Sequence, residues 1–264
     1  MLFLNHKYNK DDYVKQREEV WVSINSLLDP KTIGKKCNHE LKIDLSAPFS
    51  EGLEINKADE WLGRLSAQFM QLSYDLSEII LSNKLACLFQ GDNEKKAYFL
   101  FNLRYYFTVF VNDIYTFWNM VAQYLNVLYS NQNIDQSKRA WEKEEESIDN
   151  GFLQKDLVMK NIDLKPIHDL YNSELNKKNI IKLRHQAVHR RKIQVLGLGR
   201  EFYTKITENM IEFAAEYKAE DPVKLEKDAI ELMVKIKEIL PQCVGFLEKE
   251  IKERKYSHIK FINS

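Results

Sequence analysis

Apolar residues recur at helical spacing through much of the chain. Over residues 10–28 they occupy one side of a predicted first helix, which Pro30 ends. The pattern then breaks down as far as Ile55. A second apolar stripe begins after Asn56, whose side chain suits a helix start, and predicts a helix that ends near Ser82. Two helices are therefore expected in the first third of the chain.

The longest uninterrupted helical segment begins after QGDN, residues 90–93, which predicts a turn. From there to Tyr129 neither Gly nor Pro intervenes. Of the 31 aromatic residues in the chain, 12 fall between Tyr98 and Tyr129. Because large aromatic side chains dominate protein cores, this segment is expected to be the central core helix.

The same segment carries a polar seam, a set of residues at steps of four and three that share one side of a helix. Its members are Asn112, Thr116, Asn119, Gln123 and Asn126. One interpretation is a solvated face, or an internal hydrogen-bond network that fixes packing. The functional interpretation is that Asn112, Asn119 and Asn126 line a cleft or a symmetric dimer interface.

A last long helix is predicted near the C-terminus. GLGREF, residues 197–202, marks a break before it. Asp221 then suits a helix cap and Pro222 suits a first turn. The apolar spacing continues to about Arg254, and we expect a kink at Pro241.

Two short segments alternate polar and apolar residues, as half-buried strands do. They are ELKIDL, residues 40–45, and SHIKFI, residues 257–262, and we expect them to pair as a small accessory sheet. With only eight Gly and five Pro, the chain lacks the turns of a sheet-rich fold. The predicted fold is an all-α, up-and-down helical bundle over residues 56–264, preceded by an N-terminal extension over residues 1–55.

Composition indicates a cytoplasmic protein. Three cysteines lie far apart, which favours neither a disulfide framework nor a zinc site and indicates a reducing compartment. The N-terminal apolar run is too short for a signal peptide. Residues 114–134 carry no charge but include six amide side chains, so we expect no membrane span.

The 39 Lys and Arg residues balance 39 Asp and Glu over the whole chain, but not locally. Residues 176–192 contain no acidic side chain. The cations of this basic window are Lys177, Lys178, Lys182, Arg184, Arg190, Arg191 and Lys192. An anionic ligand, RNA or a nucleotide, is the partner that such a window favours. The alternative interpretation is a basic, solvated surface that binds no ligand.

Within this window Arg184 and His189 enclose four residues, and the polar His185 follows the arginine directly. This spacing resembles that of the HEPN superfamily, helical-bundle proteins whose catalytic members carry an Arg, four to six intervening residues and a His. The motif also follows a long aromatic helix, as in that family. Arg191 stands where many family nucleases have a Tyr.

The resemblance implies a dimeric, metal-independent endoribonuclease whose products end in a 2′,3′-cyclic phosphate. His189 would act as general base or acid, Arg184 would stabilise the phosphate, and His185 would orient or assist. The remaining cations of the basic window would follow the RNA backbone. By analogy, such an enzyme would serve bacterial defence or a toxin role, with an antitoxin protein as a further partner.

Chemistry agrees with these roles, because metal-independent RNA cleavage needs a base with a pKa near 7 and a fixed cation beside the phosphate. Five positions along a helix, however, correspond to a rotation of about 140°, so Arg184 and His189 do not share a stripe. Either Arg184 reaches around near the helix start, or a second subunit completes the pair. The resemblance implies the latter.

Three alternatives remain open at the level of sequence. His185 and His189 share a helix face and resemble half of a metal site, but the surrounding cations disfavour a divalent ion, so we expect no metal and no cofactor. A non-catalytic HEPN-like module would bind nucleotide, RNA or a protein partner through the same face. A structural helical dimer would use the polar seam as its contact.

Overall fold

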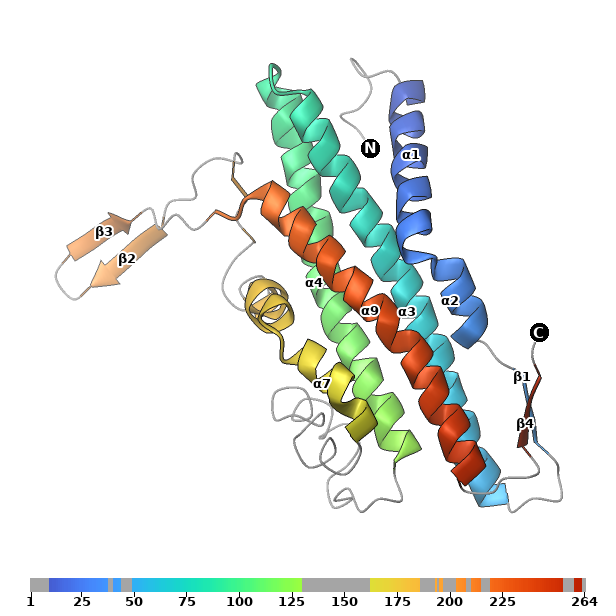
Figure 1. Ribbon diagram of the computed structural model, residues 1–264. Helices are drawn as coiled ribbons and strands as arrows, with labels where there is room; N and C mark the ends of the chain where they lie inside the picture. Colours follow the sequence, from blue (N-terminus) through green and yellow to red (C-terminus); the bar gives the residue numbers. More distant parts are fainter. Residues whose placement is uncertain are drawn as a thin grey trace.

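Helices packed lengthwise dominate the computed structural model (Figure 1). It describes residues 10–37, 40–43, 49–129, 162–185, 193, 195–196, 203–207, 210–214, 219–253 and 259–262. In chain order the elements are α1 (Lys10–Leu28), α2 (Pro30–Cys37), β1 (Glu40–Ile43), α3 (Phe49–Leu88), α4 (Asn93–Leu128), the 3-10 helix η2 (Ile162–Leu164), α7 (Lys165–Tyr171), the π-helix η3 (Leu175–Ile181), α8 (Lys182–His185), β2 (Tyr203–Thr207), β3 (Met210–Ala214), α9 (Pro222–Glu253) and β4 (Ile259–Ile262). The predicted all-α helical bundle is confirmed.

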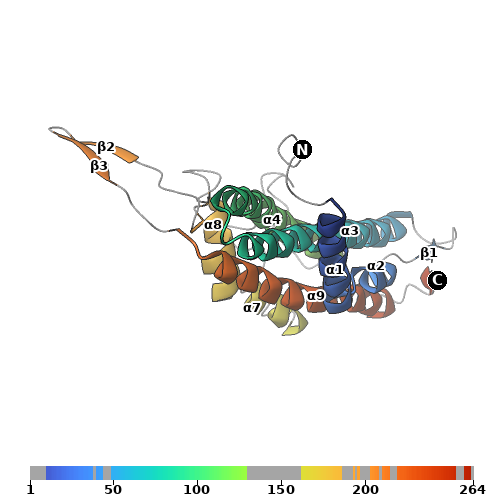
Figure 2. The ribbon, with the colours of Figure 1, turned by 90° about the horizontal axis from the view of Figure 1, so that it is seen from above.

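A hairpin of α3 and α4 forms the centre of the bundle. Asp92 caps α4, and its side chain accepts a hydrogen bond from the backbone N–H of Lys95 at 3.1 Å. The predicted turn at residues 90–93 and the helix that follows it are therefore confirmed. α9 lies along α3 and α4 in two perpendicular views (Figures 1 and 2).

The N-terminal helices α1 and α2 pack against α3 and α9. The first helix is confirmed with its predicted bounds. α1 ends at Leu28, just before Pro30, as predicted, but the short helix α2, which starts at Pro30 after Asp29 at φ 46°, was not predicted. Proline suits a first helical position, where its missing N–H has no helical acceptor. The division into domains near residue 56 stays a prediction.

The bounds predicted for α3 are too narrow at both ends. The helix begins at Phe49 rather than near Asn56 and ends at Leu88 rather than near Ser82. Ile55, 2% exposed, and the fully buried Leu85 extend the apolar stripe of α3 in the two directions. Asn56 is an exposed residue inside the helix and does not cap it. The buried stripe thus continues beyond both predicted ends.

The core joins all the long helices in one hydrophobic cluster. As predicted, α4 provides most of the large side chains of this core. Its fully buried residues include Phe107, Phe110, Phe117, Trp118 and Tyr124. α9 buries Leu225, Ala229, Leu232, Ile236, Ile239 and Leu240. Pro241 lies inside α9, and its exposed position lets the ring face away from the core.

Two small antiparallel sheets accompany the helices. β1 pairs with β4, with Glu40 opposite Ile262 and Ile43 opposite Ile259, so the predicted pairing of the two alternating segments is confirmed. β2 and β3 form a second sheet, which lies to one side of the bundle in Figure 1 and was not predicted. The break predicted at residues 197–202 lies outside the described residues.

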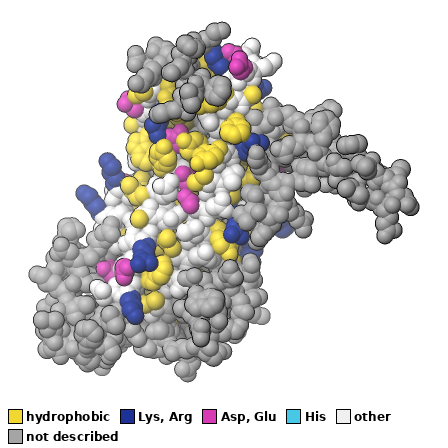
Figure 3. All heavy atoms as spheres, turned by 180° about the vertical axis from the view of Figure 1, so that it is seen from behind, with side chains coloured by type: hydrophobic (Ala, Val, Ile, Leu, Met, Phe, Trp, Pro, Cys, Tyr) yellow, Lys and Arg dark blue, Asp and Glu magenta, His cyan; other side chains and the backbone are white. Residues whose placement is uncertain are grey.

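The face turned away from the viewer of Figure 1 shows hydrophobic side chains gathered over part of the bundle (Figure 3). The large hydrophobic residues that α3 and α4 expose are Met70, Tyr74, Leu88, Phe101 and Tyr105. In the part of the chain that the structure describes, no helix has the length and apolar character needed to cross a membrane.

Candidate functional site

Arg184, the arginine of the predicted motif, lies on a short helical segment that packs against α4. The π-helix η3 continues directly into α8, and both elements contact α4. Ile180 and Leu183 face the core and are buried. π-Helical turns recur at functional sites because their extra residue per turn changes where the following side chains lie.

A buried asparagine fixes η3 on α4. Asn176 is 0% exposed, and its Oδ1 accepts a hydrogen bond from the indole Nε1 of Trp118 at 3.0 Å. Its Nδ2 donates to the backbone carbonyl of Tyr171 at 2.7 Å. The rings of Trp118 and Tyr171 meet edge to face, with centroids 5.3 Å apart. The position of η3, and of α8 that follows it, is therefore set by this network.

The side chain of Arg184 rests on an aromatic ring. Its guanidinium carbon lies 3.9 Å from the ring centroid of Tyr115 on α4. The Nε atom of Arg184 is buried and has no hydrogen-bond partner among the described residues. None of the ion pairs between described residues involves this arginine either. Among the described residues, this half-buried cation thus contacts an aromatic ring and no carboxylate.

Tyr115 stands at the edge of the polar seam, between Asn112 and Asn119 on α4. The Nδ2 of Asn112 donates to the carbonyl of Thr108 at 2.9 Å, which occupies that side chain within its own helix. The Oδ1 of Asn119, in contrast, is buried without a hydrogen-bond partner among the described residues. The structure therefore brings Arg184 to the border of the seam, although sequence reasoning treated the two separately.

The described lysines of the basic window, Lys177, Lys178 and Lys182, lie on the surface, where acidic and aromatic neighbours engage two of them. Lys178 forms an ion pair with Glu174 at 2.9 Å, one turn earlier in the chain. The amine of Lys177 lies 5.1 Å from the ring centroid of Tyr171. Lys182 is exposed. The basic window itself contains no acidic residue, but an acidic side chain, that of Glu174, contacts it in the structure.

Several predicted site residues cannot be compared with the structure. His189, Arg190, Arg191 and Lys192 lie outside the described residues, as do the side chains of His185 and Asn126. Their roles stay predictions.

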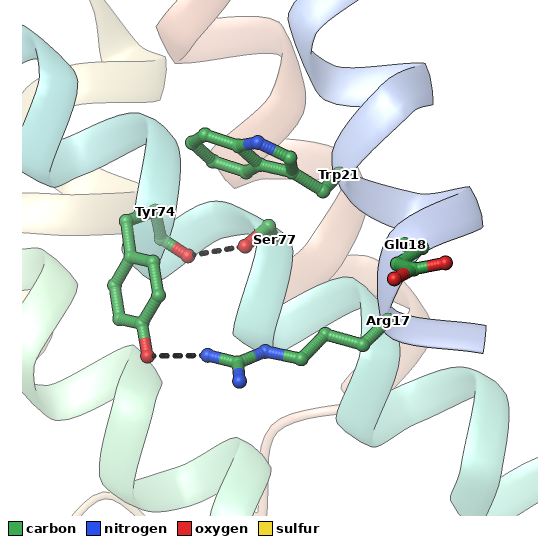
Figure 4. A pocket seen from close by; sticks show the side chains of 5 residues that line it. All are labelled: Arg17, Glu18, Trp21, Tyr74 and Ser77. Carbon is green, nitrogen blue, oxygen red and sulfur yellow. Dashed lines mark hydrogen bonds between the residues drawn. The ribbon is translucent and has the colours of Figure 1, made fainter. Parts of the chain in front are cut away.

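A second polar cluster, which sequence reasoning missed, joins α1 to α3. The Nε of Arg17 forms an ion pair with Glu78 at 2.9 Å, and its Nη2 donates to the hydroxyl of Tyr74 at 2.9 Å. Figure 4 shows this arginine along a pocket of about 270 Å³, lined also by Glu18, Trp21 and Ser77. The signal for it was an arginine within the apolar stripe of the first helix. Because Glu78 neutralises the charge of Arg17, we interpret this cluster as a structural link between α1 and α3.

Asp75 is an acidic residue in the α3–α4 interface and is 1% exposed. Its Oδ1 accepts a hydrogen bond from Gln71 at 3.0 Å. Burial, and then the neighbouring Asp113 carboxyl of α4, raise the pKa of Asp75 to about 7. This side chain is therefore a proton-binding group in the middle of the bundle.

Among the described residues, no group of three or more His, Cys, Asp or Glu side chains is placed to hold a metal ion. Comparisons of the chain with protein-family models, with curated proteins and with solved structures give no match.

Proposed function

We propose that this chain is a HEPN-type, metal-independent endoribonuclease that acts as a homodimer. The observation that supports it best is the state of Arg184, a half-buried guanidinium stacked on Tyr115 and bound by no described carboxylate. A guanidinium that is partly withdrawn from water and that no described carboxylate pairs is a strong ligand for phosphate.

In the proposed reaction His189 takes the proton of a ribose 2′-OH, whose oxygen then attacks the adjacent phosphorus. Arg184 stabilises the charge that develops on the phosphate oxygens. The bond to the 5′-oxygen breaks, that oxygen is protonated, and a 2′,3′-cyclic phosphate remains. His185 orients or assists, and Lys177, Lys178, Lys182, Arg190, Arg191 and Lys192 follow the RNA backbone.

Cleavage of an end-labelled RNA of mixed sequence in EDTA tests the proposal. The wild-type protein is expected to cut it and to leave cyclic phosphate ends. The Arg184→Ala/His189→Ala variant should be slower by at least about 100-fold, since a general base and a phosphate ligand are both lost.

A matched control for this pair is Arg64→Ala/His168→Ala. Arg64 also stacks on an aromatic ring, that of Trp61 at 4.7 Å, and His168 is half-buried beside Asp169. This control should cut RNA at the wild-type rate. Equal cleavage by all three proteins would point to a contaminating nuclease and would refute the assignment.

A non-catalytic HEPN-like module that binds RNA or a nucleotide is the second candidate. The exposed Lys182 and the surface positions of Lys177 and Lys178 favour it, because a basic face binds phosphates whether or not chemistry follows. This module should retain RNA without cutting it and should release it as salt rises. Arg190→Glu/Arg191→Glu should weaken retention about 10-fold or more, whereas His189→Ala should leave it unchanged. If the amount of RNA retained changes neither with salt nor with the charge reversal, this candidate is excluded.

The toxin or defence role, a cytoplasmic location and an antitoxin partner belong to the same proposal and rest on the family resemblance. A protein partner of this kind would be expected to cover the face that carries Arg184.

A further inference from the structure

The ring of Tyr115 lies directly against the guanidinium of Arg184. It belongs to α4, and its neighbours Ile114 and Phe117 are fully buried in the core. The ring is therefore carried by a helix that is anchored in the core on both sides of Tyr115. Arg184, in contrast, sits near the end of a four-residue helix, α8.

From this geometry we infer that Tyr115 is a positioning residue for Arg184, and that the face of its ring performs this role. The inference rests on the proposed function. A guanidinium held over a ring at 3.9 Å has its motion restricted to the ring face, while its full positive charge is kept. With Nε buried against the protein, the Nη groups are the donors left to reach a phosphate.

An aromatic ring differs here from the more common orienting group, a carboxylate. A carboxylate would fix the guanidinium by two hydrogen bonds, but it would also neutralise the charge and compete with the phosphate for the same donors. Among the described residues no carboxylate pairs with Arg184, whereas Arg17 is paired in that way with Glu78. Among the described residues, Arg17 is thus tied to a carboxylate of another helix, whereas Arg184 contacts only the ring of Tyr115 through its guanidinium.

The backbone of Arg184 is set by the same stretch of α4. Trp118, one turn after Tyr115, holds Asn176 of η3 by the hydrogen bond from its indole nitrogen. η3 leads without a break into α8. One turn of α4 therefore determines both where the main chain of α8 lies and where the guanidinium points.

The inference is tested by RNA cleavage kinetics of the full chain, with Tyr115→Phe, Tyr115→Leu and Arg184→Ala compared with wild type. Tyr115→Phe keeps the ring and should stay within about two-fold of the wild-type kcat. Tyr115→Leu should lower kcat about 10-fold with a smaller change in KM, since the phosphate charge grows in the transition state. Adding Tyr115→Leu to Arg184→Ala should cause no further loss, because the two residues act as one unit. Tyr105→Leu, which alters an exposed tyrosine of the same helix, should leave kcat unchanged.

A spectroscopic readout separates this inference from the proposed function. In a nitrogen–proton NMR spectrum the Nε–H signal of Arg184, identified by its loss in Arg184→Ala, should be shifted by the ring current of Tyr115. That shift should persist in Tyr115→Phe and disappear in Tyr115→Leu, whose fold is checked by its remaining signals.

The outcomes are distinct. If wild type cuts RNA, Arg184→Ala does not and Tyr115→Leu equals wild type, the positioning role is overturned while the nuclease stands. Equal losses in Tyr115→Phe and Tyr115→Leu would assign the role to the hydroxyl and overturn the ring-face inference. If wild type does not cut RNA, the nuclease proposal fails, and the NMR shift then decides on its own whether the ring of Tyr115 orients Arg184: loss of the shift in Tyr115→Leu but not in Tyr115→Phe supports it, and a shift unchanged in Tyr115→Leu overturns it.

Discussion

Replacing Asn176 by alanine is expected to lower the free energy of unfolding by about 2–4 kcal/mol, because two buried hydrogen-bonding groups lose their partner at once. The indole N–H of Trp118 and the carbonyl of Tyr171 both bond to this one amide. Neither group gains water in exchange, since Trp118 is fully buried and Tyr171 is 4% exposed. Urea unfolding at 25 °C measures the loss.

Asn172→Ala is the matched control for this prediction. Asn172 is exposed, and its Nδ2 donates to the carbonyl of His168 at 2.9 Å, which water can replace. Its substitution should cost less than about 1 kcal/mol. Equal losses in the two variants would mean that the Asn176 network does not anchor η3, and the account of how Arg184 is placed would lose its backbone support.

The sequence predicted those elements whose local signals and tertiary environment agree. α1 and α4 have a clear apolar stripe, and α4 also has a capping aspartate, Asp92, before a segment free of Gly and Pro. The pairing of β1 with β4 followed from alternation in two short segments at opposite ends of the chain. In α1 and α4 the periodicity of the apolar residues is also the periodicity of burial.

Errors arose where one residue type has two structural uses. Pro30 does follow the end of α1, but proline is equally suited to a helix start, and the helix α2 that begins there was not predicted. Asn56 was interpreted as a cap, although it lies on the solvent side of a longer helix. The hairpin of β2 and β3 was not predicted, although both of its strands contain β-branched residues, because GLGREF before it marks a break and not a strand.

The candidate site was predictable only in part. The charge and spacing of the basic window pointed to Arg184, but not to its ring partner, because Tyr115 is one of many aromatic residues in α4. Asn176 appeared as the first residue of the basic window, and nothing in the sequence shows that it is buried against Trp118. The neutralisation of Lys178 by Glu174 follows a familiar spacing of four residues and was missed because Glu174 lies just before the window.

Asp75→Asn is expected to stabilise the bundle, and to do so more at high pH than at low pH. The carboxyl of Asp75 is surrounded by Asp113 of α4 and by Gln71 and Glu78 of α3, and the charge of Glu78 is balanced by Arg17 of α1. Its pKa rises from 3.8 in the unfolded chain to about 7 in the fold. Between these two values the folded state binds the extra proton, so the stability of the wild type falls as pH rises through this window.

An asparagine at this position removes the charge, can still accept the hydrogen bond from Gln71, and offers an N–H toward Asp113. The stabilisation by Asp75→Asn should therefore be larger at pH 8 than at pH 5 by about 1–2 kcal/mol, measured by urea unfolding at both pH values. Asp163→Asn, which alters an aspartate that is 50% exposed and paired with Lys249, should show no such difference between the two pH values. An Asp75→Asn effect independent of pH would mean that this carboxylate stays ionised in the fold.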